Sequence, residues 1–386
     1  PGAVAATYTV AGDVRRNLAA AGFTVEKKPG HGTKRERLEA RLPGGPQAPN
    51  PPRTIAIIGA GIAGACAANA FRQRGCNVTL IDRGPGPGAG ASGNPTALVM
   101  PRLDATDTPE ARALIEAYLF ARQTYGALSP DAACELPAER LARAPRDETR
   151  FNKLLDDPPL TSDLLAPLAT TEAGAGYLLP ACIAVRPAAA LPELIGDIEM
   201  RYETSVSSID AHNEGAAIHL SDGQTIMADM VILCAGDALP DFAIENAPPI
   251  TPRLGQLETI PHPTNRPAAI TDGGYVVEAF GDLVFGSTFE PADGPPRVTK
   301  TARDHNREVL KRLRPDISPS PKMDGQVSRA ALRATTPDRL PFAGPASTNR
   351  KAPDDNPAPL NSLQLVGGLG ARGFLWAPLL AELIAA

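Results

Sequence analysis

Three glycines and one aspartate have the types and spacing of a site for a dinucleotide. Gly59, Gly61 and Gly64 directly follow a short apolar run, and Asp82 ends a second one. Glycines at these positions permit a tight turn, close approach of the backbone to a pyrophosphate, and close packing of the next helix on its strand. The helix N-terminus favours an anion, and a carboxylate at the end of the next strand accepts ribose hydroxyls. This turn alone leaves NAD and FAD open as the dinucleotide.

The elements that must position these residues lie between Thr54 and Asp82. Residues 54–58 are apolar and β-branched, which is typical of a strand buried on both faces of a parallel sheet. Residues 63–73 are predicted to form a helix that Gly75 ends, and residues 77–81 a second strand. The competing interpretation is an ordinary strand–helix–strand turn. The order of strand, glycines, helix, strand and acid favours nucleotide binding.

A second glycine-rich turn lies near the end of the chain. Residues 367–374 read GGLGARGF, after an apolar run and before an apolar helix. Residues 229–236 add an acid, a buried strand and a small-residue turn, as expected for another parallel strand that reaches the cofactor. Two glycine-rich helix starts suit a long cofactor with its pyrophosphate at the first and its ring at the second, so FAD fits better than NAD. The alternative for the second turn is a plain helix cap, which needs fewer glycines.

The composition is that of a globular protein of two domains. The chain has 386 residues, of which 43% are hydrophobic, and no apolar run approaches the ~20 residues of a membrane span. The five cysteines are scattered without a CxxC pair, which predicts reduced thiols, no metal site and a cytoplasmic setting. The net charge of −5 gives no global attraction to nucleic acid, so any contact with RNA must be local.

The first 42 residues differ in charge from the rest. They hold eight basic and four acidic residues, a balance of +4, which leaves −9 for the remainder of a chain whose total is −5. They are predicted to form a helix at about residues 12–21 and flanking strands, and residues 43–52 form a proline-rich linker. Because the first residue is proline rather than methionine, we expect a piece of a longer protein.

The remainder is predicted to be α/β, with a Rossmann-like nucleotide domain and an inserted antiparallel substrate domain. Residues 251–290 alternate as antiparallel strands do, between segments that read as parallel strands. The predicted FAD-binding domain comprises residues 53–105, 187–245 and 336–386, and the substrate domain residues 106–186 and 246–335.

A basic helix is predicted over residues 297–314. It carries seven basic and two acidic residues. Such a run usually marks a solvated face, and the alternative is a surface that follows RNA phosphates. Arg307, Lys311 and Arg312 are the predicted nucleic-acid contacts.

The motifs taken together resemble those of the D-amino-acid oxidase and glycine oxidase family of FAD enzymes. Within it, the chain is similar to the oxidoreductase half of bifunctional bacterial enzymes that mature the wobble uridine of tRNA. Residues 1–42 resemble the end of their methyltransferase half, whose S-adenosyl-L-methionine site is missing, so methyl transfer is not expected. The segments that carry the resemblance are IAIIGAGIAG with Asp82, ASGNP at 91–95, ADMVILCAG at 228–236, GYVVEAFGDLVFGSTFE, LRATTPDRLPFAGP at 332–345 and GGLGARGF.

The resemblance implies a reaction. FAD would oxidise the 5-carboxymethylaminomethyl group of (2-thio)uridine 34 in tRNA to the 5-aminomethyl form and release glyoxylate, ahead of methylation. Arg333 occupies the position of the family's carboxylate-binding arginine, whose planar fork suits a carboxylate. The alternative for Arg333 is a surface ion pair. Arg372 and Tyr275 are further candidates for the same pocket.

The resemblance also implies a set of cofactor contacts and leaves two other functions open. One alternative is an oxidase of free glycine, sarcosine or a D-amino acid, and the other is a non-catalytic flavin-binding module. We expect no membrane and no metal as partners. The residues predicted to contact FAD are Gly59, Gly61, Gly64, Asp82, Ser92, Asn94, Val206, Ala235, Gly236, Gly368, Leu369, Gly370 and Gly373.

Overall fold

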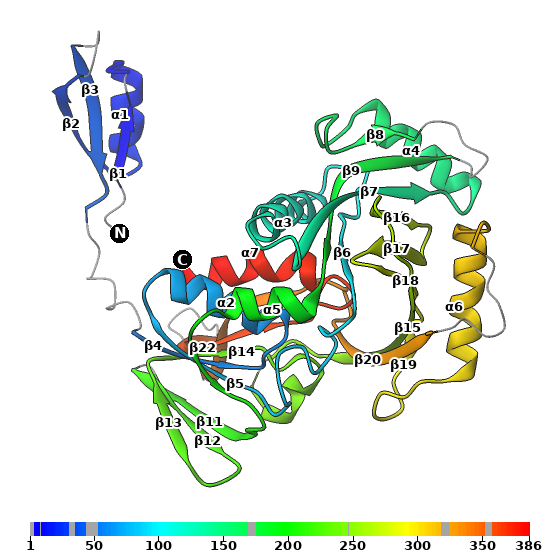
Figure 1. The fold of residues 1–386 in the computed structure, drawn as a ribbon. Coiled ribbons are helices and arrows are strands. Elements are labelled where there is room, and N and C mark those ends of the chain that lie inside the picture. The colour runs from blue at the N-terminus through cyan, green and yellow to red at the C-terminus, as the bar shows by residue number, and fades with distance from the viewer. Residues whose placement is uncertain are drawn as a thin grey trace. The chain divides into compact units, whose positions relative to one another are not determined.

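The chain forms two units, residues 1–52 and 53–386, which are described separately (Figure 1). The computed structural model describes residues 4–7, 9–30, 35–43, 53–168, 175–212, 214–245, 247–317, 325–351 and 357–386. The first unit is a three-stranded antiparallel sheet with one helix, in the order β1-β3-β2. Its elements are β1 (Val4–Thr7), α1 (Gly12–Ala20), β2 (Thr24–Pro29) and β3 (Glu36–Arg41). The predicted linker lies almost entirely outside the described residues.

The second unit is built around a six-stranded sheet in the order β10-β5-β4-β14-β22-β21. The first five strands are parallel and β21 is antiparallel. Ile58 lies opposite Ile81 and Leu233, so three parallel strands end at one level. The strands are β4 (Thr54–Ile58), β5 (Asn77–Ile81), β10 (Glu199–Arg201), β14 (Met230–Leu233), β21 (Phe342–Lys351) and β22 (Pro357–Gly367).

Helices cover one face of this sheet and a small sheet covers the other (Figure 1). Ile55 and Ile57 pack in a core with the helices, whereas Ala56 and Ile58 pack in a second core with the small sheet, because side chains alternate along a strand. The helices are α2 (Ile62–Gln73), α5 (Pro187–Ile195) and α7 (Gly373–Ala385). The small antiparallel sheet contains β11 (Val206–His212), β12 (Gly215–Leu220) and β13 (Thr225–Ala228), and η1 (Gly236–Phe242) follows β14.

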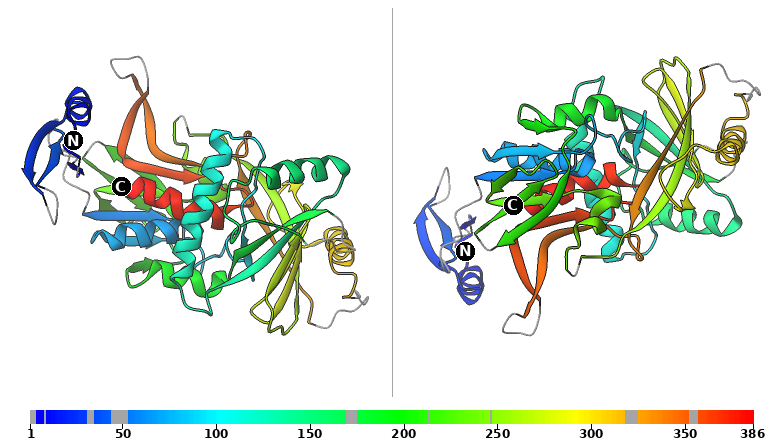
Figure 2. Two further views of the ribbon diagram at one scale, coloured as in Figure 1. Left: turned by 90° about the horizontal axis from the view of Figure 1, so that it is seen from above. Right: turned by 90° about the horizontal axis from the view of Figure 1, so that it is seen from below.

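A ten-stranded, mostly antiparallel sheet forms the other half of this unit (Figure 2). Its order is β19-β15-β18-β17-β16-β7-β9-β6, with β20 also paired to β15 and β8 to β9. The predicted combination of a parallel nucleotide-binding sheet and an antiparallel sheet is therefore confirmed. The strands are β6 (Ala97–Val99), β7 (Ala133–Leu141), β8 (Ala166–Pro167), β9 (Gly176–Val185), β15 (Thr251–Pro261), β16 (Ala268–Thr271), β17 (Tyr275–Ala279), β18 (Asp282–Gly286), β19 (Glu290–Pro291) and β20 (Val327–Thr335).

Helix α3 (Pro109–Gly126) links the two sheets. It begins at Thr108, whose hydroxyl accepts a hydrogen bond from the Ala111 N–H at 3.2 Å. Near its other end the fully buried Tyr125 donates a hydrogen bond to the Phe374 carbonyl of α7 at 2.8 Å. α3 also packs on β7 and β9, and α4 (Pro145–Asp156) packs on β9. No helix in the described ranges is both long and apolar enough to cross a membrane.

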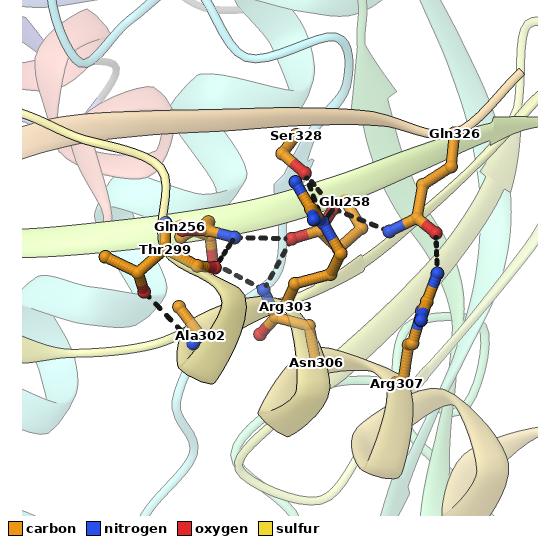
Figure 3. Close-up of polar contacts among 9 residues, drawn as sticks. All are labelled: Gln256, Glu258, Thr299, Ala302, Arg303, Asn306, Arg307, Gln326 and Ser328. Carbon is orange, nitrogen blue, oxygen red and sulfur yellow. Dashed lines mark hydrogen bonds and ion pairs between the residues drawn. The ribbon is translucent and has the colours of Figure 1, made fainter. Parts of the chain in front are cut away.

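A buried polar network fixes the basic helix α6 (Lys300–Leu313) to β15 and β20 (Figure 3). Glu258 of β15 is fully buried and accepts hydrogen bonds from four side chains. Two of these, Gln256 at 2.7 Å and Asn306 at 3.4 Å, reach one carboxylate oxygen. The other oxygen accepts from Gln326 at 2.8 Å and from Ser328. The carboxylate therefore joins three segments that are distant in the sequence.

Two of the three predicted nucleic-acid contacts on α6 also bind within the chain. Arg312 donates to both oxygens of buried Asp272, at 2.6 and 3.1 Å. Burial opposes ionisation of Asp272, but the hydrogen bonds from Arg312 and the Gly274 N–H and the charges of Arg312 and Arg143 together lower the pKa of that carboxyl. Arg307 donates to Gln326 at 2.7 Å, whereas Lys311 is exposed. Arg307 and Arg312 thus help to hold α6 in place, and their predicted binding of RNA stays a prediction.

Truncation of Glu258 tests the role of this network. We expect Glu258→Ala to lower the free energy of unfolding by about 3 kcal/mol, because several buried donors lose their acceptor. Urea denaturation followed by circular dichroism measures the change. Glu308→Ala, on the exposed side of α6, is the matched control and should stay within about 0.5 kcal/mol of wild type. Equal effects of the two substitutions would contradict this role.

Candidate active site

The carboxyl ends of the parallel strands bring the predicted cofactor residues together. The Gly59 N–H donates to the Ile81 carbonyl at 2.8 Å, and the Cys234 N–H donates to the Ile58 carbonyl at 2.8 Å. These bonds extend the ladder just past the strand ends, so the turns after β4, β5 and β14 lie side by side. Ala235 and Gly236 continue directly from Cys234, and Gly236 has a φ of +60°. Val206 begins β11, two residues after Thr204, whose N–H donates to the Asp82 carbonyl at 2.9 Å.

The first glycine turn is too tightly packed for any side chain at two of its positions. A Cβ at Gly64 would lie 1.8 Å from the Gly59 carbonyl oxygen, which no movement of a flexible side chain relieves. A Cβ at Gly59, where φ is +107°, would lie 2.4 Å from the Cys234 oxygen. Helix α2 therefore starts directly against the end of β4. Its N-terminal N–H groups point into the space beyond the strand ends, where an anion is stabilised.

Asp82 and Ser92 line the start of α2. The two Asp82 carboxylate oxygens accept hydrogen bonds from the Ala60 N–H at 2.5 Å and the Gly84 N–H at 2.6 Å. A carboxylate has about four acceptor positions, so both oxygens keep capacity for hydroxyl donors. The Ser92 hydroxyl accepts from the Ile62 N–H at 2.9 Å, and a Cβ at Gly61 would come within 3.0 Å of the same hydroxyl. The loop that carries Ser92 thus folds over the helix start.

The second glycine turn lies next to the first and is joined to the antiparallel sheet. A Cβ at Gly373 would lie 3.1 Å from Ile62, so the starts of α7 and α2 are adjacent. Gly368 and Gly370 have φ values of +69° and +55°, in the region that favours glycine. The Gly370 N–H donates to the Ala334 carbonyl at 2.8 Å, next to an isolated bridge between Leu369 and Thr335. The turn that is predicted to face the flavin is therefore bonded to the residue that follows Arg333.

Arg333 is held by neutral acceptors and has no carboxylate partner in the described part of the chain. Its guanidinium donates to the Thr288 carbonyl at 2.9 Å and to the Ser287 hydroxyl at 2.8 Å. Burial lowers its pKa, although the group remains a cation at neutral pH. A Cβ at Gly255 would lie 2.0 Å from a guanidinium nitrogen of Arg333, so only glycine leaves room for it there. Among the described residues Arg333 does not form the surface ion pair that was the alternative for it, and a preformed cation without such a partner suits a substrate carboxylate.

Tyr275 lies close to Arg333. It starts β17 opposite Gly286, the residue before Ser287. Burial raises the pKa of Tyr275, and the nearby positive charge of Arg333 partly offsets this effect. The phenol is therefore neutral in the physiological range and available as a hydrogen-bond donor. The structure brings together two of the three residues predicted for the substrate pocket.

A further arginine, Arg329, was not predicted. Arg329 and Arg333 are four residues apart on β20, so they share one face of the sheet. The Arg329 guanidinium donates to the Asn94 side-chain oxygen at 2.9 Å and to the Gly90 carbonyl at 2.5 Å. Asn94, predicted to contact the cofactor, is thus bound by an arginine that fixes the loop to the antiparallel sheet. The only signal for Arg329 in the sequence was its distance of four residues from Arg333, which places both arginines on one face of a strand.

Positive charge is concentrated around Arg372, the residue that precedes α7. Burial lowers the pKa of Arg372, and the charges of Arg102, Arg140 and Arg339 lower it further. Arg102 and Arg140 also lie near Tyr177, whose pKa burial raises to about 12 against their opposing charges. Among the described residues, none of these four arginines has an ion pair or a side-chain hydrogen bond. An excess of unpaired cations favours an anionic ligand.

The basic helix α6 lies on the other face of the antiparallel sheet from Arg333. In an antiparallel pair, residues directly opposite share a face, so Arg333 shares one with Arg253, and Glu258 shares the opposite one with Ser328. Glu258 and Ser328 contact α6, as described above. Figures 1 and 2 show α6 on the far side of this sheet from α2 and α7. Lys311 is therefore not part of the surface that surrounds Arg333.

A cleft of about 520 Å³ lies at the amino ends of the strands of the six-stranded sheet, whereas the glycine turns lie at their carboxyl ends. It is lined by the starts of the strands, including Thr54, Asn77 and Glu199. None of the residues predicted to contact FAD lines it.

Among the described residues, no group of three or more His, Cys, Asp or Glu side chains is placed to hold a metal ion.

Comparison with known families agrees with this geometry. Residues 54–386 match the family of FAD-dependent oxidoreductases that includes D-amino-acid oxidase, and residues 1–43 match a family of S-adenosyl-L-methionine-dependent methyltransferases. The chain belongs to the FAD-dependent oxidoreductases. Curated relatives of this oxidoreductase include two proteins named tRNA 5-methylaminomethyl-2-thiouridine biosynthesis bifunctional protein MnmC. That of Caulobacter sp. (strain K31) is 36% identical over 395 residues, and that of Maricaulis maris (strain MCS10) 35% over 390.

The two relatives are longer than this chain. The alignments cover 100% and 99% of the oxidoreductase described here but only 63% and 60% of the relatives. Among solved structures, glycine oxidase from Bacillus cereus ATCC 14579 superposes with a TM-score of 0.70 at 17% identity, over 86% of this chain and 94% of that one. Iminodiacetate oxidase from Chelativorans sp. BNC1 gives 0.68 at 20% identity over the same shares. These likenesses confirm the predicted fold, including the antiparallel sheet.

The residues present fit the FAD that the family uses. The backbone at the first turn packs closely because Gly59 and Gly64 have no side chains, and the starts of α2 and α7 are adjacent there. Gly64→Ala should close the turn and lower bound flavin at least about tenfold, because the new methyl group overlaps a backbone carbonyl. Flavin absorbance per protein after purification measures this. Gly126→Ala, whose Cβ meets nothing within 4 Å, is the control and should retain full flavin content.

Gly255→Ala tests the placement of Arg333 separately. The added Cβ would displace the guanidinium, and a misplacement of about 1 Å costs on the order of 100-fold in rate. We expect kcat/KM for a carboxylate substrate to fall by about that factor while flavin content stays at the wild-type level. Steady-state kinetics and flavin absorbance on the same preparation separate the two effects. Unchanged kcat/KM would show that Arg333 does not need this space.

Proposed function

We propose that this chain oxidises the 5-carboxymethylaminomethyl group of (2-thio)uridine 34 in tRNA to the 5-aminomethyl group and releases glyoxylate. The observation that carries the proposal is Arg333, a preformed cation with no counter-ion in the described ranges, on a strand bonded to the second glycine turn. The names of the MnmC relatives, which match the whole of this chain, support the choice of substrate. The reacting unit is an N-substituted glycine, so it has a carboxylate for Arg333.

The proposed chemistry divides between the cofactor and the protein. Bound FAD would supply the two-electron acceptor for the hydride that leaves the glycine methylene. Arg333 holds the carboxylate through its two-pronged donor geometry, and Tyr275 is the neighbouring donor. The nitrogen loses its proton as the C–N bond becomes an imine, and addition of water then releases glyoxylate and leaves the primary amine on the nucleoside. Orientation of the C–H bond is the protein's main contribution.

The proposed FAD contacts follow the two turns. Gly59, Gly61 and Gly64 would let the pyrophosphate approach the α2 N-terminus, and Asp82 would accept the ribose hydroxyls. The residues at the second turn would lie along the flavin ring, where the α7 N-terminus favours negative charge on the reduced ring. These are Gly368, Leu369, Gly370 and Gly373.

Unpaired positive charge favours a tRNA substrate over a free amino acid. A free glycine needs one cation for its carboxylate, which Arg333 supplies. Arg102, Arg140, Arg339 and Arg372 add four cations from four different segments, without carboxylate partners in the described part of the chain. Several phosphates of an RNA would neutralise such a group. A tRNA substrate also implies a cytoplasmic setting. Methylation of the product would belong to a methyltransferase of the family that residues 1–43 match.

Anaerobic mixing with modified tRNA tests the proposed function. We expect tRNA that carries the carboxymethylaminomethyl group to bleach the flavin band and to yield glyoxylate, and sarcosine to be at least about 100-fold less efficient in kcat/KM. The rate with tRNA should fall steeply between 50 and 200 mM salt, as phosphate contacts predict. Preference for free glycine or sarcosine would overturn the proposal in favour of a small-molecule oxidase. The absence of bleaching by any of these substrates would indicate a flavin-binding module.

A further inference from the structure

Phe289 is an exposed aromatic side chain beside the proposed carboxylate site. It lies between β18 and β19 and is 51% exposed, although a phenylalanine next to a buried strand normally turns inward. It follows Thr288, whose carbonyl binds Arg333. The chain therefore places an open aromatic ring one residue from a group that orients the carboxylate-binding arginine.

Two arginines lie within cation–π distance of the ring. The guanidinium carbons of Arg253 and Arg333 lie 5.8 and 5.7 Å from the centre of the Phe289 ring. Arg253 and Arg333 are direct cross-strand partners, so both reach the ring from the same face of the sheet. This is the face opposite α6. Within the described residues Arg253 has no ion pair or side-chain hydrogen bond, so its charge is available to a phosphate.

We propose that Phe289 is the stacking platform for the base whose side group is oxidised. Proteins bind unpaired RNA bases by stacking them on aromatic rings and on arginine planes, and they add cations for the backbone. Phe289 supplies the aromatic ring, and Arg253 and Arg333 supply the arginine planes and the cations, all in one place. An amino-acid oxidase would gain nothing from an exposed ring here, because its substrate has no base.

The geometry fits uridine 34 rather than a neighbouring base. The carboxylate of the reacting group is joined to the uracil ring by a short chain of single bonds. A carboxylate on Arg333 therefore keeps the uracil ring within reach of Phe289, which contacts the same guanidinium. Stacking would fix the direction from which the group enters, and Arg253 would meet a flanking phosphate. This inference rests on the proposed function and specifies how its substrate is recognised.

Kinetics of Phe289 variants with two substrates test the role. We expect Phe289→Ala to raise KM for the modified tRNA about ten- to a hundredfold, the range for loss of one base stack. Flavin content and kcat/KM for sarcosine should remain at wild-type levels. Phe289→Tyr should stay within about threefold of wild type with tRNA, because it keeps a ring. Met227→Ala removes another exposed apolar side chain, 70% exposed on β13. It should leave KM and kcat/KM unchanged with both substrates.

A double-mutant cycle between Phe289 and base 34 of an anticodon stem-loop RNA tests the contact directly. Removing the base at position 34 should weaken binding to the wild-type protein about ten- to a hundredfold. The same removal should have no effect on Phe289→Ala, since the partner of the base is already gone. Fluorescence anisotropy gives the four dissociation constants.

Three results separate the possibilities. Independent effects of the base and of Phe289 would overturn the stacking proposal. An equal loss of activity with tRNA and with sarcosine in Phe289→Ala would also overturn it, because Phe289 would then only support Arg333. Wild-type protein that binds the stem-loop through base 34 but does not oxidise the modified tRNA would leave the stacking site standing and reject the proposed function.

Discussion

The hydrogen bond from the Gly370 N–H to the Ala334 carbonyl joins the two sheets, and the proposed site depends on it. On one side, Gly370 belongs to the turn that starts α7, next to the start of α2. On the other side, Ala334 follows Arg333 on β20. A redox centre and a substrate must meet within a few ångströms for hydride transfer, so two separately packed sheets need a fixed junction. Backbone hydrogen bonds give such a junction with little dependence on side chains.

The two faces of the antiparallel sheet carry different groups. One face carries Glu258 and Ser328, whose network binds α6 (Figure 3). The other face carries Arg253 and Arg333, which have no carboxylate partner among the described residues. A basic helix would by itself suggest nucleic acid, yet Arg307 and Arg312 serve to attach it. Charge that is neutralised inside the chain contributes little to an external partner, so pairing matters more than the count of basic residues.

Glycines provide the room that neighbouring groups need in this site. Gly255 leaves room for the Arg333 guanidinium, and Gly59 and Gly64 let α2 start directly against the end of β4. In each case a Cβ would meet atoms at 2.4 Å or less, closer than any real contact.

The arginines around Arg372 form a cluster of positive charge that no carboxylate in the described chain neutralises. An acidic protein can therefore present a local positive surface that its net charge of −5 does not reveal.

The nucleotide-binding half of the fold could be predicted from local sequence patterns. Gly59, Gly61, Gly64 and Asp82 belong to one local strand–turn–helix–strand unit, whose spacing is set by backbone geometry alone. Arg333 was reached through family resemblance, and its role as a carboxylate-binding residue stays a proposal. The surroundings of Arg329, Phe289 and Arg372 could be seen only in the tertiary structure. Their neighbours come from strands and loops that are far apart in the sequence, and which face of the sheet an arginine uses depends on strand register, which no local pattern specifies.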